Sequence, residues 1–307
     1  MKLIESKVEI IEQEPGLEGV YKNIEKAGRL CYKSEDKICE GSAEKMVNFL
    51  VGKLHGTPLE HGTIYLHRCF PIDAEETIAF KQRYTLNKYS QIKCELIKEE
   101  IHIYVTTNYR VLIENKWLDD LQYLCEPTTY HEKRVSAKFI LSRSIANEFI
   151  RHRVMSPCQE SQRYCNYNLG KFGSEITFVI PEWVKDRIND TASYNNNDDL
   201  ARVPYAEAVF DPRMTSNKAI SIWLKDLKNT ESDYLDLINE GLKPEDARSV
   251  LNNDCKTELM LTGFTSDWEH FLSLRTAKAA HPDARILANN LKWLLESNSL
   301  INCTNGN

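Results

Sequence analysis

Residues 134–164 place a run of cations directly behind an apolar segment, and this arrangement constrains the fold more than any other feature. Apolar residues alternate with polar ones at the start of the segment, the pattern of a half-buried strand, at Val135, Ala137, Phe139 and Leu141. Ser144 is predicted to cap a short helix that ends at residues 151–153, and Pro157 discourages helix beyond it. The sequence therefore predicts cationic side chains where a helix gives way to a loop, a common place for binding groups.

The cationic run holds three arginines and one histidine between residues 151 and 163. A half-buried cation is rarely left without a partner, because its desolvation is costly. The local carboxylates, Glu148 and Glu160, are few for that many cations. A phosphate-bearing ligand would supply the missing anions, since the planar arginine fork matches phosphate oxygens two at a time. Taken alone, the same run also fits a solvated helix end that makes weak surface ion pairs.

The composition is that of a globular protein with a local basic site. The chain has 307 residues, 42% hydrophobic and 27% charged, with a formal net charge of −6. That length allows one large domain or two modest ones, and no internal repeat or clear boundary divides it, so we expect a single domain. The acidic balance argues against a nucleic-acid binder and makes an RNA-binding domain a weak alternative. A basic pocket in an acidic protein favours a small anionic ligand.

The cysteine content and the lengths of the apolar runs indicate the cellular compartment in which the protein is expected. The chain has nine cysteines, an odd number, with no CxxC pair. This pattern favours free thiols in a reducing cytoplasm over a disulfide framework, and the missing pairs argue against a zinc site, so no metal is expected. No apolar run approaches the roughly 18–20 residues of a membrane span, and the charged N-terminus does not read as a signal peptide. We therefore expect a cytoplasmic protein without membrane contact.

Hydrophobic periodicity predicts a mixture of helices and strands, and hence the α+β class. Strands are expected at 2–12, 63–70, 101–105, 135–141 and 176–180. Helices are expected at 17–30, 43–54, 144–153, 218–239, 244–248, 267–275 and 283–296. Residues 186–203 are rich in Asn and Asp, which is typical of an exposed loop.

Four segments resemble the flavin-dependent thymidylate synthases. The strongest is Arg151-His152-Arg153 followed, after seven residues, by Ser161 and then Arg163-Tyr164, which is similar to the long signature of that family. The other segments agree in order and spacing: His55-Gly56-Thr57-Pro58-Leu59-Glu60-His61, Pro244-Glu245-Asp246-Ala247-Arg248, and His270-Phe271-Leu272-Ser273-Leu274-Arg275. The resemblance covers most of the chain except about 74–133 and 185–215, which look like insertions.

The resemblance implies both a fold and a reaction. The fold would be a single domain over residues 1–307 with a curled antiparallel sheet flanked by helices. The reaction would be reductive methylation of dUMP to dTMP, with methylenetetrahydrofolate as carbon donor, FAD as hydride carrier and NADPH as reductant. The family also implies a homotetramer with sites shared between subunits. No cysteine nucleophile is needed, and Ser161 is interpreted as a hydrogen-bonding group.

The resemblance assigns roles to individual residues. The dUMP site would comprise Glu148, Arg151, Gln159, Glu160, Ser161, Gln162, Arg163, Arg248 and Arg275. The FAD site would comprise Thr57, Arg151, His152, Arg153, Gln159 and His270. Arg275 would be the catalytic residue, because a fixed cation near N3 and O4 of uracil stabilises the negative charge that makes C5 nucleophilic.

Several positions depart from the family pattern. Cys158-Gln159 stands where Asn-Glu is frequent, and Glu148 stands where Gln is frequent. Phe264 and Ser266 stand where other members have Asn and Arg facing FAD. Every cation of the family pattern is retained, so the departures as a whole indicate a divergent branch and not a loss of function. Phe264 and Ser266 are the best support for an alternative, a non-catalytic nucleotide-binding protein that has lost its flavin.

Overall fold

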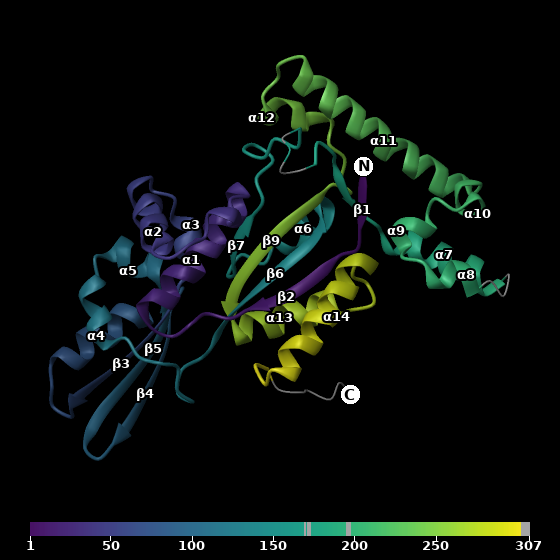
Figure 1. Ribbon diagram of the computed structural model, residues 1–307. Coiled ribbons are helices and arrows are strands. Elements are labelled where there is room, and N and C mark those ends of the chain that lie inside the picture. The colour runs from purple at the N-terminus through teal and green to yellow at the C-terminus, as the bar shows by residue number, and fades with distance from the viewer. Residues whose placement is uncertain (169, 171–172, 195–197, 302–307) are drawn as a thin grey trace.

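A four-stranded antiparallel sheet occupies the centre of the computed structural model (Figure 1), which describes residues 1–168, 170, 173–194 and 198–301. The strand order is β2 (Lys7–Ile11), β6 (Arg134–Ser142), β9 (Lys256–Phe264) and β7 (Ser156–Gln159). The predicted alternation is confirmed in β6, since Val135, Ala137, Phe139 and Leu141 are all buried. They pack against α6 (Arg143–Phe149), α13 (Thr265–Arg275) and α14 (Pro282–Ser297), which cover one face of the sheet.

The other face of the central sheet meets the long helix α1 (Gly16–Tyr32). Ala27 and Leu30 of this helix pack with Cys158 of β7 and Met260 of β9. Through α1 the central sheet joins a second, three-stranded sheet with the order β3 (Thr63–Pro71), β5 (Glu100–Asn108) and β4 (Gln91–Ile97). This second sheet is also antiparallel.

Short helices surround the second sheet. They are η1 (Glu35–Lys37), α2 (Ser42–Gly52), α3 (Gly56–Leu59), α4 (Glu76–Thr85), α5 (Tyr109–Asn115) and η2 (Leu118–Tyr123). Residues from α1, α2, α4 and α5 form one apolar core with β3 and β5. The segment 74–133, whose role the sequence does not indicate, thus supplies two of the three strands of this sheet.

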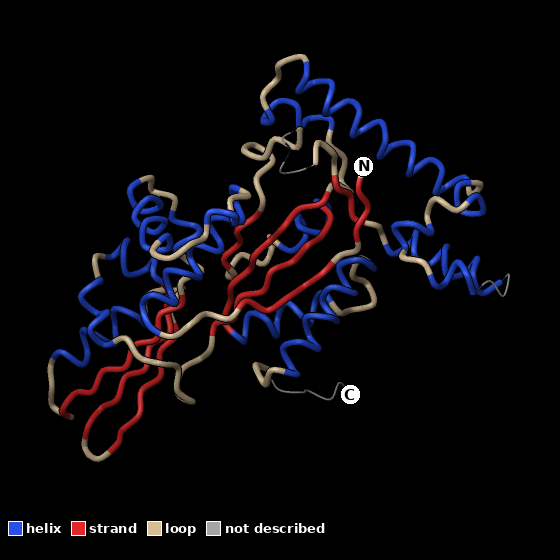
Figure 2. The backbone as a smooth tube through the Cα atoms, in the orientation of Figure 1, coloured by secondary structure: helices blue, strands red, loops and turns tan. Residues whose placement is uncertain are grey.

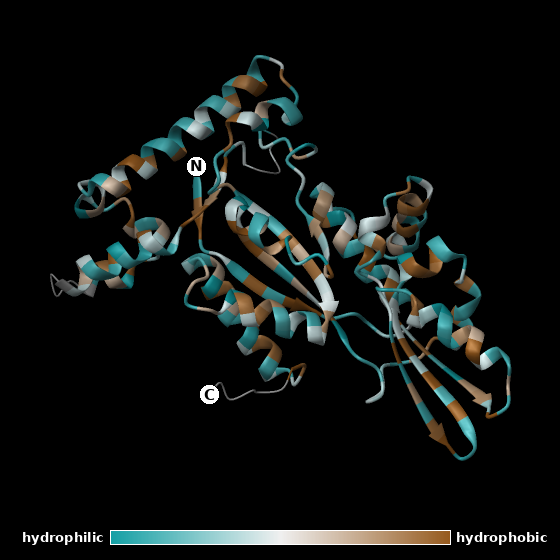
Figure 3. Ribbon diagram, turned by 180° about the vertical axis from the view of Figure 1, so that it is seen from behind, coloured by the Kyte–Doolittle hydropathy of each residue, from teal (hydrophilic) through white to brown (hydrophobic). Residues whose placement is uncertain are grey.

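A third group of elements lies at the other end of the central sheet, where β1 (Lys2–Ile4) pairs in parallel with β8 (Thr177–Val179) (Figure 2). The helices of this group are α7 (Glu182–Tyr194), α8 (Asp198–Arg202), α9 (Tyr205–Ala208), α10 (Pro212–Thr215), α11 (Lys218–Asn239), α12 (Pro244–Ala247) and η4 (Arg248–Val250). Hydrophobic and hydrophilic residues alternate along α11 (Figure 3), and its buried face includes Trp223, Leu227 and Tyr234.

The α+β class is confirmed, and three details of the prediction are wrong. The strand expected at 2–12 is divided into β1 and β2, which belong to different sheets. The helix cap is Ser142, whose hydroxyl accepts from Ile145 N, whereas Ser144 lies inside the helix. Most of the loop expected at 186–203 is helical, in α7 and α8, because Val184, Ile188 and Ala192 recur at helical spacing and are buried.

Strands that were expected in one curled antiparallel sheet belong to three sheets in the described residues. The curl, the single domain over 1–307 and the insertions at about 74–133 and 185–215 stay predictions. Among the described helices, none combines the length and the apolar character that a membrane span requires.

Candidate functional site

Two helix ends meet on one side of the central sheet. Residues 151–153 follow the end of α6, and Arg275 is the last residue of α13. Both helices pack on the same face of the sheet, and the rings of Phe149 and Phe271 lie edge to face with their centroids 4.9 Å apart. The apolar contact between the helices therefore holds the two cationic ends close together.

A cavity of about 530 Å³ lies between these helix ends. Its lining contains five of the predicted site residues and three neighbours: Arg151, His152, Arg153, His270 and Arg275, with Val154, Asp267 and Leu274. Within the described part of the chain, Arg151 and Arg153 have no carboxylate partner and are exposed. The cavity thus presents two guanidinium groups to which an anion can bind.

Arg275 is held in a fixed orientation at this cavity. Its Nη1 donates to Glu148 Oε2 at 2.6 Å, and its Nη2 donates to the Glu148 carbonyl oxygen at 2.7 Å. Its Nε donates to His152 Nε2 at 3.1 Å. A guanidinium has five N–H donors, so three contacts leave two donors for a ligand. Glu148, expected at the substrate, contacts Arg275 directly.

His152 accepts the Arg275 hydrogen bond only while its ring is neutral. Burial, followed by the charges of Arg275 and His270, lowers the pKa of His152 to about 4. The imidazole therefore stays neutral at ordinary pH and keeps Nε2 available as an acceptor.

We expect the ring of His152 to titrate with a midpoint near 4 when it is followed by NMR of the purified chain. In Arg275→Gln the midpoint should rise, because one of the two neighbouring charges is lost, yet burial, the larger cause, should keep it below the ordinary 6.5. A His152→Gln sample assigns the signal. A wild-type midpoint at or above the ordinary value would contradict the neutral-acceptor role.

Glu160 lies apart from this cavity in a buried network of charges. Its Oε2 accepts from Lys256 Nζ at 2.8 Å, and its Oε1 accepts from Tyr167 Oη at 3.1 Å. Lys256 also contacts Glu258 Oε1 at 2.6 Å, and Lys33 binds the same oxygen. Glu160 therefore has its charge matched within the chain, beside a second, smaller cavity of about 320 Å³.

Arg163 and Arg248 form a third group around Glu245. Arg163 Nη2 lies 3.6 Å from Glu245 Oε2, and Arg248 Nε donates to the Glu245 carbonyl oxygen at 3.1 Å. Ser161 Oγ accepts from Arg163 N at 3.2 Å. These side chains do not line the cavity that holds Arg275.

The remaining predicted residues also lie outside that cavity. Gln159 Nε2 donates to Thr257 Oγ1 at 3.4 Å, and Gln162 is buried. Thr57 lies in α3, which contacts α1, α2, α5 and β7. One chain therefore brings together Glu148, Arg275, His270 and residues 151–153, and leaves the other predicted residues in separate places.

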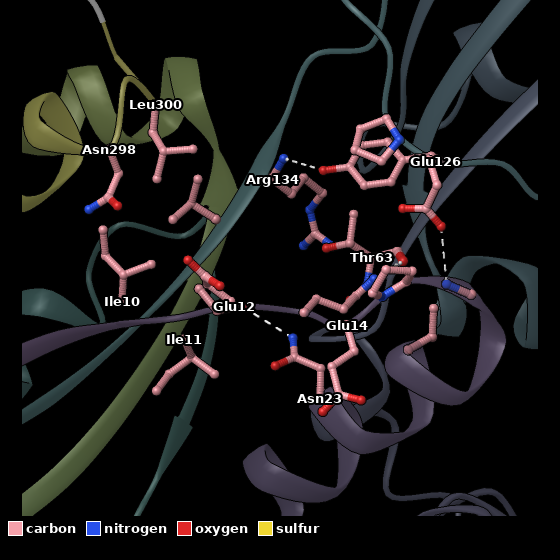
Figure 4. A pocket seen from close by; sticks show the side chains of 18 of the residues that line it. Ile10, Ile11, Glu12, Glu14, Asn23, Thr63, Glu126, Arg134, Asn298 and Leu300 are labelled. Carbon is pink, nitrogen blue, oxygen red and sulfur yellow. Dashed lines mark hydrogen bonds between the residues drawn. The ribbon is translucent and has the colours of Figure 1, made fainter.

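A further cavity of about 560 Å³ was missed by the sequence analysis (Figure 4). Arg134 and Thr63 lie on one side of it, and Ile10 and Leu300 on the other. Arg134 Nη1 donates to the Glu60 carbonyl oxygen at 3.0 Å. Burial lowers the pKa of Arg134 to about 10. The lining comes from segments far apart in the sequence, so no local pattern marks it.

Comparison with known proteins gives one family. Residues 73–297 match the family model described as "Thymidylate synthase complementing protein". A flavin-dependent thymidylate synthase of Pyrococcus furiosus is 31% identical over 147 residues, which cover 48% of each chain. One of Mycobacteroides abscessus is 30% identical over 152 residues, covering 48% of this chain and 51% of that protein. The chain thus spans about half the length of the curated relatives it matches.

Among solved structures, the chain is similar to one described as a UMP/dUMP methylase PolB from Streptomyces cacaoi bound with 5-Br dUMP. The likeness covers 97% of this chain and 93% of the other, at 17% identity and a TM-score of 0.42, which is too low to establish a shared fold. The family match covers most of the chain and includes the signature at 151–164 and Arg275. The chain therefore belongs to the flavin-dependent thymidylate synthase family.

Proposed function

We propose that the chain catalyses reductive methylation of dUMP to dTMP, with methylenetetrahydrofolate as carbon donor, FAD as hydride carrier and NADPH as reductant. The observation that carries this proposal is the fixed guanidinium of Arg275 at a cavity that also holds Arg151 and Arg153. Family membership implies a flavin, and the donor set fits one. The unpaired guanidinium groups suit the anionic phosphates of a dinucleotide, and neutral His152 suits its rings.

Arg275 is the proposed catalytic residue. Glu148 and His152 accept hydrogen bonds from three of its N–H groups. The two remaining N–H groups would donate to the pyrimidine. A cation fixed before the reaction stabilises negative charge on uracil at no cost of reorganisation. FAD, when bound, supplies the hydride.

The remaining assignments follow the family pattern residue by residue. Residues 151–153 and His270 would border the flavin, together with Thr57 and Gln159. Glu148, Arg151 and the segment Gln159–Arg163, with Arg248, would bind dUMP. Thr57 and the Arg163–Arg248 group lie outside the Arg275 cavity of their own chain, so they would reach a site of another copy. This separation supports a homotetramer with shared sites.

One observation favours a second candidate, a non-catalytic nucleotide-binding protein without flavin. Phe264 is buried, and the guanidinium of Arg134 lies over its ring at 5.5 Å. Ser266 is hydrogen-bonded to Glu132 through its backbone N–H and its hydroxyl. Both positions, where other members present Asn and Arg to FAD, are therefore occupied by contacts within the chain.

Incubation of the purified chain with excess FAD separates the two candidates. The enzyme should turn yellow with flavin absorbance, and under anaerobic conditions its reduced flavin should reoxidise only when dUMP and methylenetetrahydrofolate are both added. Arg153→Ala should weaken flavin retention, whereas Arg187→Ala, at an exposed arginine over Trp183, should not. Protein that stays colourless while binding dUMP would support the second candidate. Protein that binds neither ligand would contradict both.

A further inference from the structure

Three potential metal ligands lie on one face of the second sheet. His67 and Cys69 are two residues apart on β3, so both side chains project from the same face. The antiparallel register pairs Cys69 with His102 of β5, which places the second imidazole on that face as well. Strands β3 and β5 run side by side at the lower left of Figure 1. The backbone therefore brings the three side chains together.

The ligand atoms form a compact triangle. His67 Nε2 lies 3.0 Å from His102 Nδ1, and Cys69 Sγ lies 3.5 Å from His67 Nε2 and 3.3 Å from His102 Nδ1. Tetrahedral zinc, with bonds of about 2.0–2.1 Å to nitrogen and about 2.3 Å to sulfur, sets N–N edges of about 3.3 Å and N–S edges of about 3.6 Å. The observed edges are within a few tenths of an ångström of these values.

From this geometry we propose that His67, Cys69 and His102 form a zinc site, separate from the cavity that holds Arg275. Two imidazoles and a thiolate are ligands that zinc accepts readily. Three protein ligands leave a fourth position, which a water molecule takes. That position faces solvent, because Cys69 is exposed.

Each of the two imidazoles has a neighbouring side chain on the side away from the triangle or against its ring. The ring of Tyr104 stacks on that of His67 with centroids 4.4 Å apart and an interplanar angle of 1°. Glu100 Oε2 lies 3.9 Å from His102 Nε2, the ring nitrogen that does not face the triangle. A carboxylate behind a histidine is the usual outer partner of a metal ligand, since it fixes the tautomer and the ring.

The sequence expectation of no metal rested on the missing CxxC pairs. The pair here is a histidine and a cysteine with one residue between them, and the third ligand comes from a strand 33 residues further along the chain. The pairing of β3 with β5 brings the three ligands together. A search of the sequence for closely spaced cysteine pairs therefore does not detect the site.

The test is cobalt and zinc binding by the full chain after treatment with a chelator. Wild type should bind one equivalent of Co²⁺ and develop a thiolate-to-cobalt charge-transfer band, which zinc then displaces. Loss of an outer-shell partner typically costs about 10–100-fold in metal affinity, so Cys69→Ser and His102→Asn should each lose more than about 100-fold. Cys69→Ser should also lose the charge-transfer band.

Cys94→Ser is the matched control, since Cys94 is an exposed cysteine of the same sheet whose register partner is Ile103 and not His102. It should bind both metals as wild type does. Circular dichroism checks that each variant is folded. Equal affinity in Cys69→Ser and Cys94→Ser, or binding without the thiolate band, would show an adventitious ion only and would overturn the proposal.

Discussion

Arg275→Lys is expected to keep part of the dUMP affinity and to lower turnover by about 10²–10³-fold, the usual cost of one missing donor at a site of developing charge. The guanidinium contacts two Glu148 oxygens and His152 Nε2 through three separate nitrogens. An ammonium is a point charge and cannot keep these three contacts while it also faces a pyrimidine. The measurement is anaerobic flavin reoxidation with saturating dUMP and methylenetetrahydrofolate, beside dUMP binding at equilibrium.

Arg285→Lys is the matched control, because the Arg285 side chain of α14 donates to the Lys278 carbonyl oxygen and does not line the cavity that holds Arg275. Its turnover should equal that of wild type. Unchanged turnover in Arg275→Lys would remove Arg275 from its catalytic role. A loss of dUMP affinity with unchanged turnover at saturation would mean that the guanidinium binds the ground state and the transition state alike.

The contact between Arg275 and residues 151–153 shows what the sequence could indicate. The signature and the helix end at Arg275 were recognisable as family segments, and the structure places them at one cavity. The Glu148 contact was not predictable, because a long-range pairing depends on how α6 and α13 cross the same sheet. Local patterns state which residues carry charge, and packing decides which charges meet.

Tertiary packing also explains why the helices within 186–203 and the charge network around Glu160 were not predicted from the sequence. The Asn and Asp residues of 186–203 suggested a loop, yet buried Val184, Ile188 and Ala192 stabilise the helix by tertiary contact. The charge network around Glu160 was not predicted, because its members come from β6, β9 and the residue after α1 as well as from the signature at 151–164. Nothing along the chain marks Lys256 as the partner of Glu160.

Lys256→Met is expected to lower the free energy of unfolding at neutral pH by about 3–5 kcal/mol, because it removes the cation that is ion-paired with the buried Glu160 carboxylate. Glu160 is 2% exposed; in the described part of the chain it would keep the hydrogen bond from the Tyr167 hydroxyl and the more distant charge of Lys33. Urea denaturation measures the change. Lys292→Met is the control, since Lys292 forms an exposed pair with Glu296 at 3.8 Å, a kind of contact worth about 0.5 kcal/mol or less.

The pH dependence of the stability lost in Lys256→Met distinguishes the loss of the lysine charge from the loss of its side-chain packing. Burial favours the protonated form of Glu258, but Lys256 and Lys33 outweigh it and lower the pKa from 4.5 to about 2. A pKa that is lower in the folded state contributes stability above the unfolded value, here roughly 3 kcal/mol, which is lost as the pH falls from 4.5 to about 2. Lys138 Nζ lies 3.0 Å from Glu258 Oε2, although the two atoms lack hydrogen-bond geometry. This ion pair remains in Lys256→Met.

In Lys256→Met the pKa of Glu258 should rise, because the largest opposing charge is removed. The variant then has less electrostatic stabilisation to lose in acid, so the difference in unfolding free energy between wild type and variant should shrink as the pH falls below 4.5. A difference that stays constant with pH would mean that the alkyl chain of Lys256 stabilises the loop by packing. A shrinking difference would mean that matched charge holds the Glu160 end of the signature loop, and with it the backbone that carries Ser161 and Arg163.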